Sequence, residues 1–328
     1  MFIKVYHSFG SQNQIQITGH VFEESPPEIS SKKNFFIANL ISLISLFKIK
    51  PLANVELELN FAEKKYKTKT MEDGFFRFEF KPETELKKGW HNVEVSGISP
   101  VYGRTVLTEG KLFVPEINDF AIISDIDDTI MKSYSATIFR RLYEVITRNA
   151  YSRKIFEDTV EWYRKLAEAF PPGSESRAFF YVSSSEWNLY EYLNIVFRKN
   201  ELPEGIFLLS SIKKLNSFFK SEKTIHDGKL IRIGRLMNTF PEEKFVLIGD
   251  NTQRDPMIYE EIATKYPRQV KAVLIRNRNQ NNQNQADEIL RKIAQTGTPA
   301  LQFRTTQEAI NFSINLGIIR IDKIEKSL

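Results

Sequence analysis

Residues 120–129 read FAIISDIDDT, an apolar run that ends in three aspartates and a threonine. A short apolar run bounded by acidic and turn-forming residues is typical of a parallel strand that is buried on both faces. Asp125 and Asp127 alternate along this extended segment, so their carboxylates are expected together at the carboxyl end of the strand. Carboxylates that close require a bound cation or a shared proton. The stretch therefore predicts a Mg²⁺ site suited to phosphoryl transfer, in which one carboxylate attacks phosphorus and the other reaches the leaving-group oxygen.

A second acidic motif follows a second buried run further along the chain. Residues 244–250 read KFVLIGD, and residues 251–255 read NTQRD, so Asp250 and Asp255 lie just beyond a predicted strand. Gly249 permits a close backbone approach at that point. Because the carboxyl ends of parallel strands meet at one edge of a sheet, these acids are expected beside the first motif.

A hydroxyl and an ammonium group lie in sequence between the two acidic motifs. The apolar run at residues 178–182, AFFYV, ends at Ser183. Lys229 is predicted to open an amphipathic helix. The apolar side of that helix would carry Leu230, Ile233, Leu236 and Met237.

In this order the four motifs resemble those of the haloacid dehalogenase (HAD) superfamily of phosphohydrolases. The residues around these motifs narrow the resemblance to one family. They are similar to the catalytic domain of the actin-patch-protein phosphatidate phosphatases at SDIDDT (124–129), YVS (181–183) with WNLY (187–190), and LIGDNTQRD (247–255). The resemblance covers roughly the last two-thirds of the chain. Glu186 stands where the family pattern leads us to expect Pro, and Gly228 where it leads us to expect His.

The resemblance implies a hydrolysis of phosphatidate to diacylglycerol and phosphate through an aspartyl-phosphate intermediate. Asp125 would be the nucleophile, and Asp127 would protonate the departing alkoxide and then deprotonate water. Ser183 and Lys229 would bind the equatorial phosphate oxygens, and Thr129 would fix the turn after the strand.

The implied cofactor is Mg²⁺. Its ligands would be Asp125, the backbone carbonyl of Asp127, and Asp250, with Asp255 binding directly or through water. The motifs bind phosphate and metal without reading the leaving group, so two alternatives stay open. One is a phosphatase of another phosphomonoester, such as a phosphoprotein, a nucleic-acid end or a small molecule, and the other is a non-catalytic module that binds lipid phosphate.

Composition sets broader limits. The chain has 328 residues, of which 41% are hydrophobic and 27% charged, enough for two domains with substantial cores. It has no cysteine, which excludes disulfides and thiolate chemistry, and its four histidines lack metal-ligand spacing. No secretory signal is recognisable in residues 1–10, and we expect a cytoplasmic protein.

The net charge favours anionic surfaces. It is +5, with an isoelectric point near 9.0, too modest to imply nucleic-acid binding. A basic cluster after the first motif either meets phosphate head groups of an anionic membrane or is ordinary helix-surface charge. It comprises Arg140, Arg141, Arg148, Arg153 and Lys154. We expect peripheral membrane contact, and the oligomeric state is left open.

Residues 1–117 have a different pattern and predict a small antiparallel β-sandwich. Asp73-Gly74 is a strong hairpin signal, and Pro115 to Asn118 mark the end of this domain. The short strands are expected at residues 14–21, 53–61, 75–80, 91–95, 101–107 and 111–114.

An apolar segment interrupts this domain. Residues 35–47 read FFIANLISLISLF between flanking lysines, and an apolar helical insertion is expected near 35–48. It is too short to cross a bilayer. The helix either packs on a neighbouring core or lies in a membrane interface.

Residues 118–328 alternate strands and helices, which predicts a doubly wound parallel sheet, and the resemblance implies that this sheet is HAD-like. After the first strand, further strands are expected at 178–182, 206–209, 245–248 and 270–275. The segments between the motifs leave no room for a large cap, so the site is expected to be open. The polar tract at 276–285, RNRNQNNQNQ, is expected to be a flexible loop, and the tail around residues 309–318 a packed helix.

Overall fold

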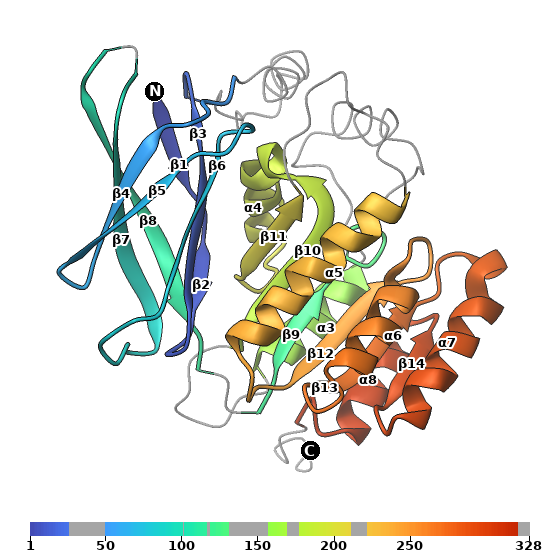
Figure 1. Cartoon of the computed structure of the whole chain (residues 1–328). Coiled ribbons are helices and arrows are strands. Elements are labelled where there is room, and N and C mark those ends of the chain that lie inside the picture. The colour runs from blue at the N-terminus through green and yellow to red at the C-terminus, as the bar shows by residue number, and fades with distance from the viewer. Residues whose placement is uncertain are drawn as a thin grey trace.

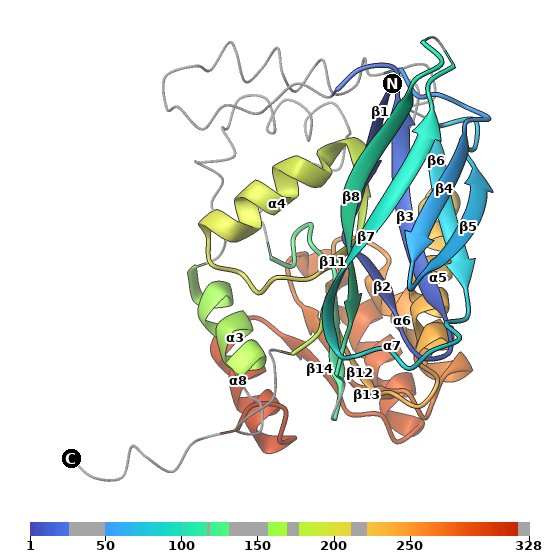
Figure 2. The same cartoon turned by 90° about the vertical axis from the view of Figure 1, so that its left-hand side faces the viewer.

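The computed structural model contains two β-sheets side by side, one with helices on both of its faces (Figures 1 and 2). It describes residues 1–25, 50–100, 102–116, 119–130, 157–168, 177–210 and 222–320. The predicted insertion at 35–48, the basic cluster at 140–154 and the segments at 131–156 and 211–221 that bear on a cap lie outside the described residues.

The first eight strands form an N-terminal sheet in the order β1-β3-β2-β8-β7-β4-β5, and β6 pairs with the other side of β3. The pairs are antiparallel except that β2 runs parallel to β8, so the predicted wholly antiparallel arrangement is wrong at that pair. The strands are β1 (Phe2–Val5), β2 (Ser8–Gly10), β3 (Ile15–Phe22), β4 (Glu56–Phe61), β5 (Lys64–Lys69), β6 (Phe75–Phe80), β7 (Gly89–Ile98) and β8 (Thr105–Val114).

This sheet closes on its own apolar core. Inward residues alternate along β4 and β6, as the period of a half-buried strand requires. Tyr66 of β5 stacks on Phe80 of β6 with ring centroids 3.7 Å apart, which brings the two outer strands together. Its fully buried side chains include Ile3, Ile17, Leu59, Phe76, Val95 and Leu112.

Two predictions for this region are wrong in detail. The turn at Asp73-Gly74 is present, with Gly74 at φ 75°, but β5 pairs with β4 and β6 pairs with β3, so it does not close a simple hairpin. The strands predicted at 101–107 and 111–114 are one strand, β8, which pairs continuously with β7.

The second sheet is parallel throughout and has six strands in the order β11-β10-β9-β12-β13-β14. In chain order this is 3-2-1-4-5-6, the doubly wound arrangement, whose strand order reverses between β9 and β12. The predicted strands are present, and β14 was not predicted. They are β9 (Ala121–Ser124), β10 (Phe179–Glu186), β11 (Ile206–Ser210), β12 (Phe245–Asp250), β13 (Val270–Arg276) and β14 (Ala300–Phe303).

Helices cover both faces of the parallel sheet, as Figure 2 shows. Apolar residues of α3, α4 and α8 pack on one face, and those of α5, α6 and α7 pack on the other. The described helices are α3 (Glu157–Glu168), α4 (Tyr190–Lys199), α5 (Glu222–Thr239), α6 (Asp255–Lys265), α7 (Gln283–Gln295) and α8 (Thr306–Asn315), with short 3₁₀ turns η1 (Trp187–Leu189) and η3 (Gln280–Asn282).

Two helix predictions need correction. Lys229 does not open α5, which begins at Glu222, although Ile233, Leu236 and Met237 are buried as expected. The tract at 276–285 is not a flexible loop, because it contains the end of β13, the turn η3 and the start of α7.

Aromatic side chains join the two sheets. Tyr6 stacks on Trp187 with centroids 4.1 Å apart, and Phe9 meets Phe180 edge-on at 5.6 Å. The His7 amide donates to the Tyr190 hydroxyl at 3.0 Å. The N-terminal sheet is therefore packed against the parallel sheet and its helices, and the predicted boundary near residue 117 falls at residues outside the described ranges.

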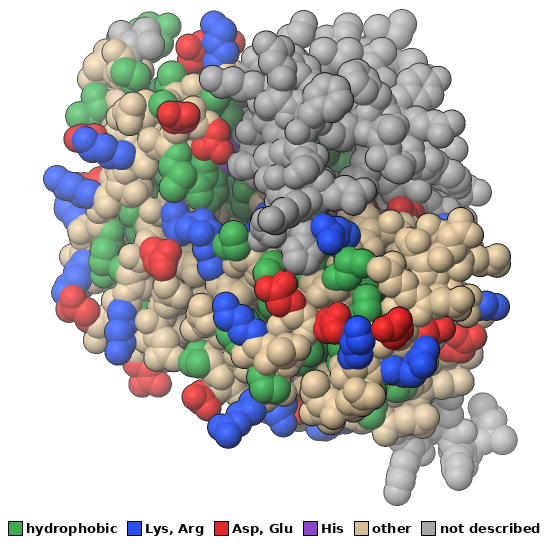
Figure 3. All heavy atoms as spheres, turned by 45° about the vertical axis from the view of Figure 1, so that its right-hand side comes forward, with side chains coloured by type: hydrophobic (Ala, Val, Ile, Leu, Met, Phe, Trp, Pro, Cys, Tyr) green, Lys and Arg blue, Asp and Glu red, His purple; other side chains and the backbone are tan. Residues whose placement is uncertain are grey.

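The described surface carries charges of both signs. In Figure 3, Lys and Arg side chains are interspersed with Asp and Glu. Among the described residues, no helix combines the length and apolar character that crossing a bilayer requires.

Candidate active site

The carboxyl ends of β9 and β12 place the two acidic motifs side by side. The strands are neighbours, with Ser124 opposite Ile248, and the Asp125 amide donates to the Ile248 carbonyl at 2.8 Å. This is the point where the strand order reverses, the usual ligand position in a doubly wound sheet. The predicted convergence of Asp125 and Asp250 is therefore present.

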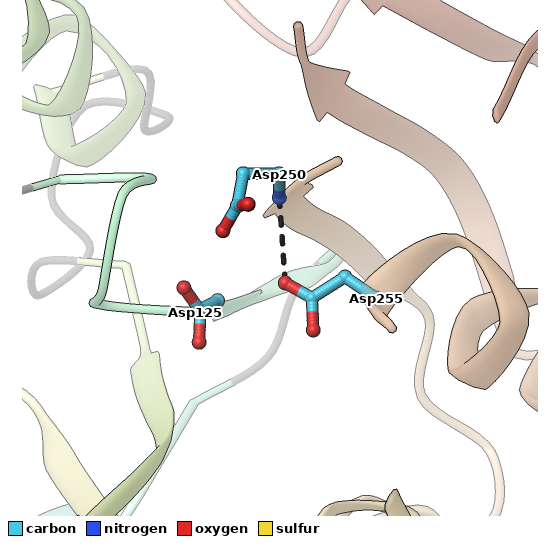
Figure 4. A group of neighbouring side chains, drawn as sticks. All are labelled: Asp125, Asp250 and Asp255. Atoms are coloured by element: carbon cyan, nitrogen blue, oxygen red, sulfur yellow. Dashed lines mark hydrogen bonds between the residues drawn. The ribbon is translucent and has the colours of Figure 1, made fainter. Parts of the chain in front are cut away.

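Asp125, Asp250 and Asp255 form a buried carboxylate cluster. One oxygen from each lies within 4.8 Å of the others, and the three side chains point toward one another in Figure 4. Each residue is at most 2% exposed. Charges of one sign packed this closely in a buried place repel strongly unless a cation joins them.

Among the described residues, Lys229 is the cation that forms ion pairs with this cluster. Its Nζ donates to Asp125 Oδ1 at 2.8 Å and to Asp255 Oδ1 at 2.5 Å, and the residue is 4% exposed. It reaches the site from the middle of α5, about two turns after the helix begins.

Asp255 is fixed by the backbone of β12. Its Oδ2 accepts from the Asp250 amide at 3.3 Å, the dashed contact in Figure 4. Gly249 makes this approach possible, because a Cβ there would lie 2.5 Å from Asp255 Oδ2. The residue thus sits at the start of α6 with its carboxylate turned back to the strand end.

Asp127 is held by a different set of groups. Its Oδ2 accepts from the Ser183 hydroxyl at 3.0 Å and from the Ser185 hydroxyl at 3.3 Å, both from the end of β10. Ser183 is fully buried, and its Oγ also accepts from the Ser185 amide at 2.9 Å. The structure brings Ser183 to Asp127, whereas the Asp127 carboxylate is not part of the three-carboxylate cluster.

Hydroxyl groups also hold Asp250. Thr129 Oγ1 donates to Asp250 Oδ2 at 3.2 Å, so the threonine of the first motif ties it to the second. Thr252 donates to Asp250 Oδ1 through its amide and its hydroxyl. Within the first motif, Asp128 adopts φ 60°, a left-handed conformation that turns the chain sharply after Asp127.

Burial dominates the electrostatics of the cluster. It raises the pKa of Asp125 well above the usual range, the Lys229 ammonium opposes that rise, and Asp255 and Asp250 add to it. Burial, with repulsion from Asp255, raises the pKa of Asp250 to about 7. For Lys229, burial opposes the charged form, but the ion pairs with Asp125 and Asp255 outweigh it and raise the pKa.

The cluster has the donor chemistry of a Mg²⁺ site. Three carboxylates face one ammonium group, and carboxylate oxygens are the ligands that Mg²⁺ takes in proteins. Asp125 Oδ2 is buried and has no hydrogen-bond partner among the described residues, so one oxygen of the cluster is left for a cation. The described residues therefore fit the metal that the sequence predicts.

Sequence reasoning missed three polar residues beside the site: Ser185, Thr252 and Asn251. Asn251 is 1% exposed and organises the Asn-rich tract. Its Oδ1 accepts from the amides of Arg278 and Asn279 at 2.7 and 2.8 Å, and its Nδ2 donates to Asn277 Oδ1 at 2.9 Å. Asn251 and Thr252 lie inside the second acidic motif and Ser185 lies two residues after Ser183, so these positions were the available signal.

The comparisons with known proteins concern the segment that carries this site. Residues 120–277 match the family described as "Phosphatidate phosphatase APP1, catalytic domain". The family resemblance predicted from the motifs is confirmed for this segment. All seven predicted site residues lie within it.

Two curated relatives cover the same part of the chain. Phosphatidate phosphatase APP1 of Saccharomyces cerevisiae is 28% identical over 156 residues, 47% of this chain and 25% of that protein. An uncharacterised protein of Schizosaccharomyces pombe is 26% identical over 162 residues, 49% of this chain and 25% of that protein. The matched segment thus spans about a quarter of the length of either relative.

The matches to solved structures have low TM-scores and indicate neither a fold nor a function. A carbohydrate acetylesterase from Xanthomonas citri covers 83% of this chain and 68% of its own, at 10% identity and a TM-score of 0.28. The PilB minor pilin from Streptococcus sanguinis covers 95% of this chain and 91% of its own, at 10% identity and a TM-score of 0.31.

Proposed function

We propose that this protein is a Mg²⁺-dependent phosphatidate phosphatase of HAD type, which hydrolyses phosphatidate to diacylglycerol and phosphate through an aspartyl-phosphate intermediate. The observation that carries the proposal is the buried cluster of Asp125, Asp250 and Asp255 around Lys229, inside the segment that matches the catalytic-domain family. Buried groups with strongly shifted pKa values at a strand-order reversal are candidates for catalysis.

Asp125 is the proposed nucleophile. Lys229 holds Oδ1 at 2.8 Å, while Oδ2 has no hydrogen-bond partner among the described residues. Lys229 therefore orients the carboxylate. One of its oxygens can form the bond to phosphorus as the bond to the alkoxide breaks, while the other faces the cation. The adjacent ammonium also favours the ionised carboxylate, which attack requires.

Asp127 is the proposed general acid and base. It gives its proton to the departing alkoxide, then takes a proton from the water that attacks the aspartyl phosphate and restores Asp125. The hydroxyl groups of Ser183 and Ser185 fix one oxygen of Asp127. In this arrangement the Ser183 hydroxyl orients the Asp127 carboxyl group. Ser183 and Lys229 are also the proposed ligands of the phosphate oxygens.

Mg²⁺ would be held by Asp125, Asp250 and Asp255, with the backbone carbonyl of Asp127, and when bound it shields the phosphate charge from the attacking carboxylate. Thr129 and Thr252 keep Asp250 oriented through hydrogen bonds to its two oxygens. The cluster supports this ligand set through its donor atoms and its burial.

The proposed substrate presents its phosphate at an anionic membrane surface. We accordingly propose a cytoplasmic protein that binds the membrane peripherally. The support is the name of the matching family and the positive net charge of +5. The alternative substrates use the same catalytic residues, so substrate class is decided by assay.

The experiment measures phosphate release with Mg²⁺ or with EDTA. The panel contains phosphatidate in mixed micelles, a phosphopeptide, a 5′-phosphorylated oligonucleotide and an aryl phosphate. Asp125→Asn is compared with Asp119→Asn, a matched control at an exposed aspartate before β9. We expect Mg²⁺-dependent release from phosphatidate that Asp125→Asn abolishes and Asp119→Asn retains.

The other outcomes separate the alternatives. Near-wild-type turnover by folded Asp125→Asn would contradict the covalent mechanism. Release from soluble substrates but not from phosphatidate would favour another phosphomonoester. Binding of phosphatidate with no release from any substrate would favour the non-catalytic module.

A further inference from the structure

A second polar feature lies beside the catalytic cluster, in a groove between the two sheets. The groove has a volume of about 320 Å³ and is lined on one side by residues of β2, β3 and β6 and on the other by β11 and α5. That volume is in the range of small-ligand pockets. None of the proposed catalytic groups lines it, although Gly228 at its edge precedes Lys229.

Three arginines line the groove: Arg77 from β6, and Arg232 and Arg235 from α5. Asp73 is the carboxylate among the lining residues, and it already accepts from the Phe75 amide at 3.1 Å. Glu79 lies 4.0 Å from Arg77 and is partly exposed. The groove therefore holds more guanidinium groups than carboxylates, and guanidinium groups stay charged at neutral pH.

The guanidinium groups have unused donors. The Nε atoms of Arg77 and Arg232 are buried and have no hydrogen-bond partner in the described part of the chain. Arg232 donates through Nη2 to the Ser183 carbonyl at 3.1 Å, which places it at the edge of the catalytic site. A buried donor without a partner costs free energy, so the described residues leave these guanidinium groups only partly satisfied.

Arg235 also repels the other two arginines. Burial, and then repulsion from Arg235, lowers the pKa of Arg77. Burial and repulsion from Arg235 also lower the pKa of Arg232 to about 10. Three like charges around a small cavity attract an anion.

Glycine at position 228 belongs to the same feature. A Cβ at Gly228 would lie 3.3 Å from Arg232 Nη1, so the missing side chain leaves space for the guanidinium group. The departure from the family pattern at this position therefore lies directly beside the arginine group.

Apart from His7, Gln16 and Thr18, the rest of the wall is mostly apolar. Phe9, Trp187 and Ile206 form buried parts of it. Met71 and Ile231, two large apolar side chains among the lining residues, are 56% and 52% exposed. A binding surface that combines an apolar wall with positive charge matches an anion attached to a hydrocarbon chain.

We propose that this groove binds an anionic lipid, with the head group at Arg77, Arg232 and Arg235 and the first part of an acyl chain along Met71, Trp187 and Ile231. The inference goes beyond the proposed phosphatase activity and does not depend on turnover. It provides a second lipid-anion site beside the catalytic cluster.

The test measures equilibrium binding of dioctanoyl phosphatidylglycerol, kept below its micellar concentration, by calorimetry in EDTA. This lipid is a phosphodiester, so phosphomonoester hydrolysis does not consume it. We expect Arg77→Gln/Arg235→Gln to weaken binding about tenfold or more, because two charge-assisted contacts are lost. Lys87→Gln/Lys88→Gln changes charge equally at exposed positions away from the groove and is expected to bind as wild type.

Two further comparisons identify the ligand class. Dioctanoyl phosphatidylcholine has the same chains without net charge, and inorganic phosphate has charge without chains. Ile231→Gln, at a 52% exposed position, is expected to weaken phosphatidylglycerol binding while leaving the melting temperature unchanged. Phosphate should bind far more weakly than phosphatidylglycerol.

Three results would overturn the proposal. Unchanged phosphatidylglycerol affinity in folded Arg77→Gln/Arg235→Gln would remove the arginines from the site. Equal affinity for phosphatidylcholine would remove the charge selection, and equal affinity for inorganic phosphate would make this a free-anion site. Because binding is measured in EDTA, loss of the proposed phosphatase activity would leave these outcomes unchanged.

Discussion

Replacing Lys229 with Met removes the ammonium group from the carboxylate cluster while keeping a long apolar side chain. Lys229 donates to Asp125 at 2.8 Å and to Asp255 at 2.5 Å, and all three residues are at most 4% exposed. The variant leaves three buried carboxylates facing one another.

The expected loss of folding stability is about 3–5 kcal/mol at pH 8 in EDTA. Removing one partner of a buried ion pair typically costs this amount, because the remaining charge is uncompensated. Two charge-assisted hydrogen bonds are lost, each of about 1.5–3 kcal/mol, and the apolar contacts of Met offset part of the sum.

The deficit depends on pH with a definite sign. A carboxyl group whose folded-state pKa is raised binds a proton more readily when folded, so stability falls as pH rises from the unfolded value through the folded one. The pKa of Asp250 is raised from 3.8 to about 7, and that of Asp125 is also raised. Without Lys229 the pKa of Asp125 rises further, so the variant's deficit is expected to be largest at pH 8 and to shrink toward pH 5.

The measurement is urea denaturation at pH 5 and at pH 8, which compares the stability of wild type, Lys229→Met and the control Lys265→Met. Lys265 is exposed at the end of α6, and its replacement is expected to change stability by less than about 0.5 kcal/mol. Equal denaturation midpoints for wild type and Lys229→Met at pH 8 in EDTA would refute the electrostatic reasoning. A deficit that grows as pH falls would refute the assigned sign.

Four further outcomes are expected. Gly249→Ala places a Cβ 2.5 Å from Asp255 Oδ2, so steady-state assays should show turnover reduced about tenfold or more. The control Gly234→Ala, whose Cβ would lie 3.4 Å from the Tyr266 hydroxyl, should keep wild-type turnover. Asn251→Ala should lower stability by about 2–4 kcal/mol in urea melts, because buried amides of the Asn-rich tract lose their acceptor; a loss below about 0.5 kcal/mol would count against that role. Burial lowers the pKa of His20 to about 3, so the unfolded chain binds a proton that the folded chain does not, and stability should fall by about 2 kcal/mol from pH 6.5 to pH 5; the same slope in His20→Gln would exclude this histidine as the cause. Asp127→Asn should impair hydrolysis of alkyl phosphates more than aryl phosphates, and equal losses in parallel assays would argue against its role as general acid.

The parallel sheet and the carboxylate cluster were predictable because their signals are local. Each strand is a continuous apolar run, and each acid directly follows one, so the sheet edge brings Asp125 and Asp250 together without further information. The sequence also indicated that Lys229 could steady Asp125, which the structure shows. Its contact with Asp255 was not predictable, because it depends on where α5 crosses the sheet.

The N-terminal sheet shows why other predictions failed. Thr108-Glu109-Gly110 looks like a break between two strands, yet Gly110 pairs with Val93 in the middle of β8. A Cβ at Gly110 would lie 2.2 Å from a methyl carbon of Val5, so the glycine marks a close approach of β1 and not a turn. Likewise, the Asn-rich tract at 276–285 is ordered by hydrogen bonds to Asn251, which composition cannot reveal.

The packing between the two sheets has a consequence for how the chain folds during synthesis. His7 bonds to Tyr190, 183 positions later, and Ser11 bonds to Thr239, 228 positions later. Contacts between such distant positions form slowly, and an N-terminal segment leaves the ribosome long before its partners exist. Tyr6 and Phe9 are therefore expected to remain solvent-accessible until residues 180–240 have emerged, so that chaperone binding to the nascent chain should end only after α5 is complete.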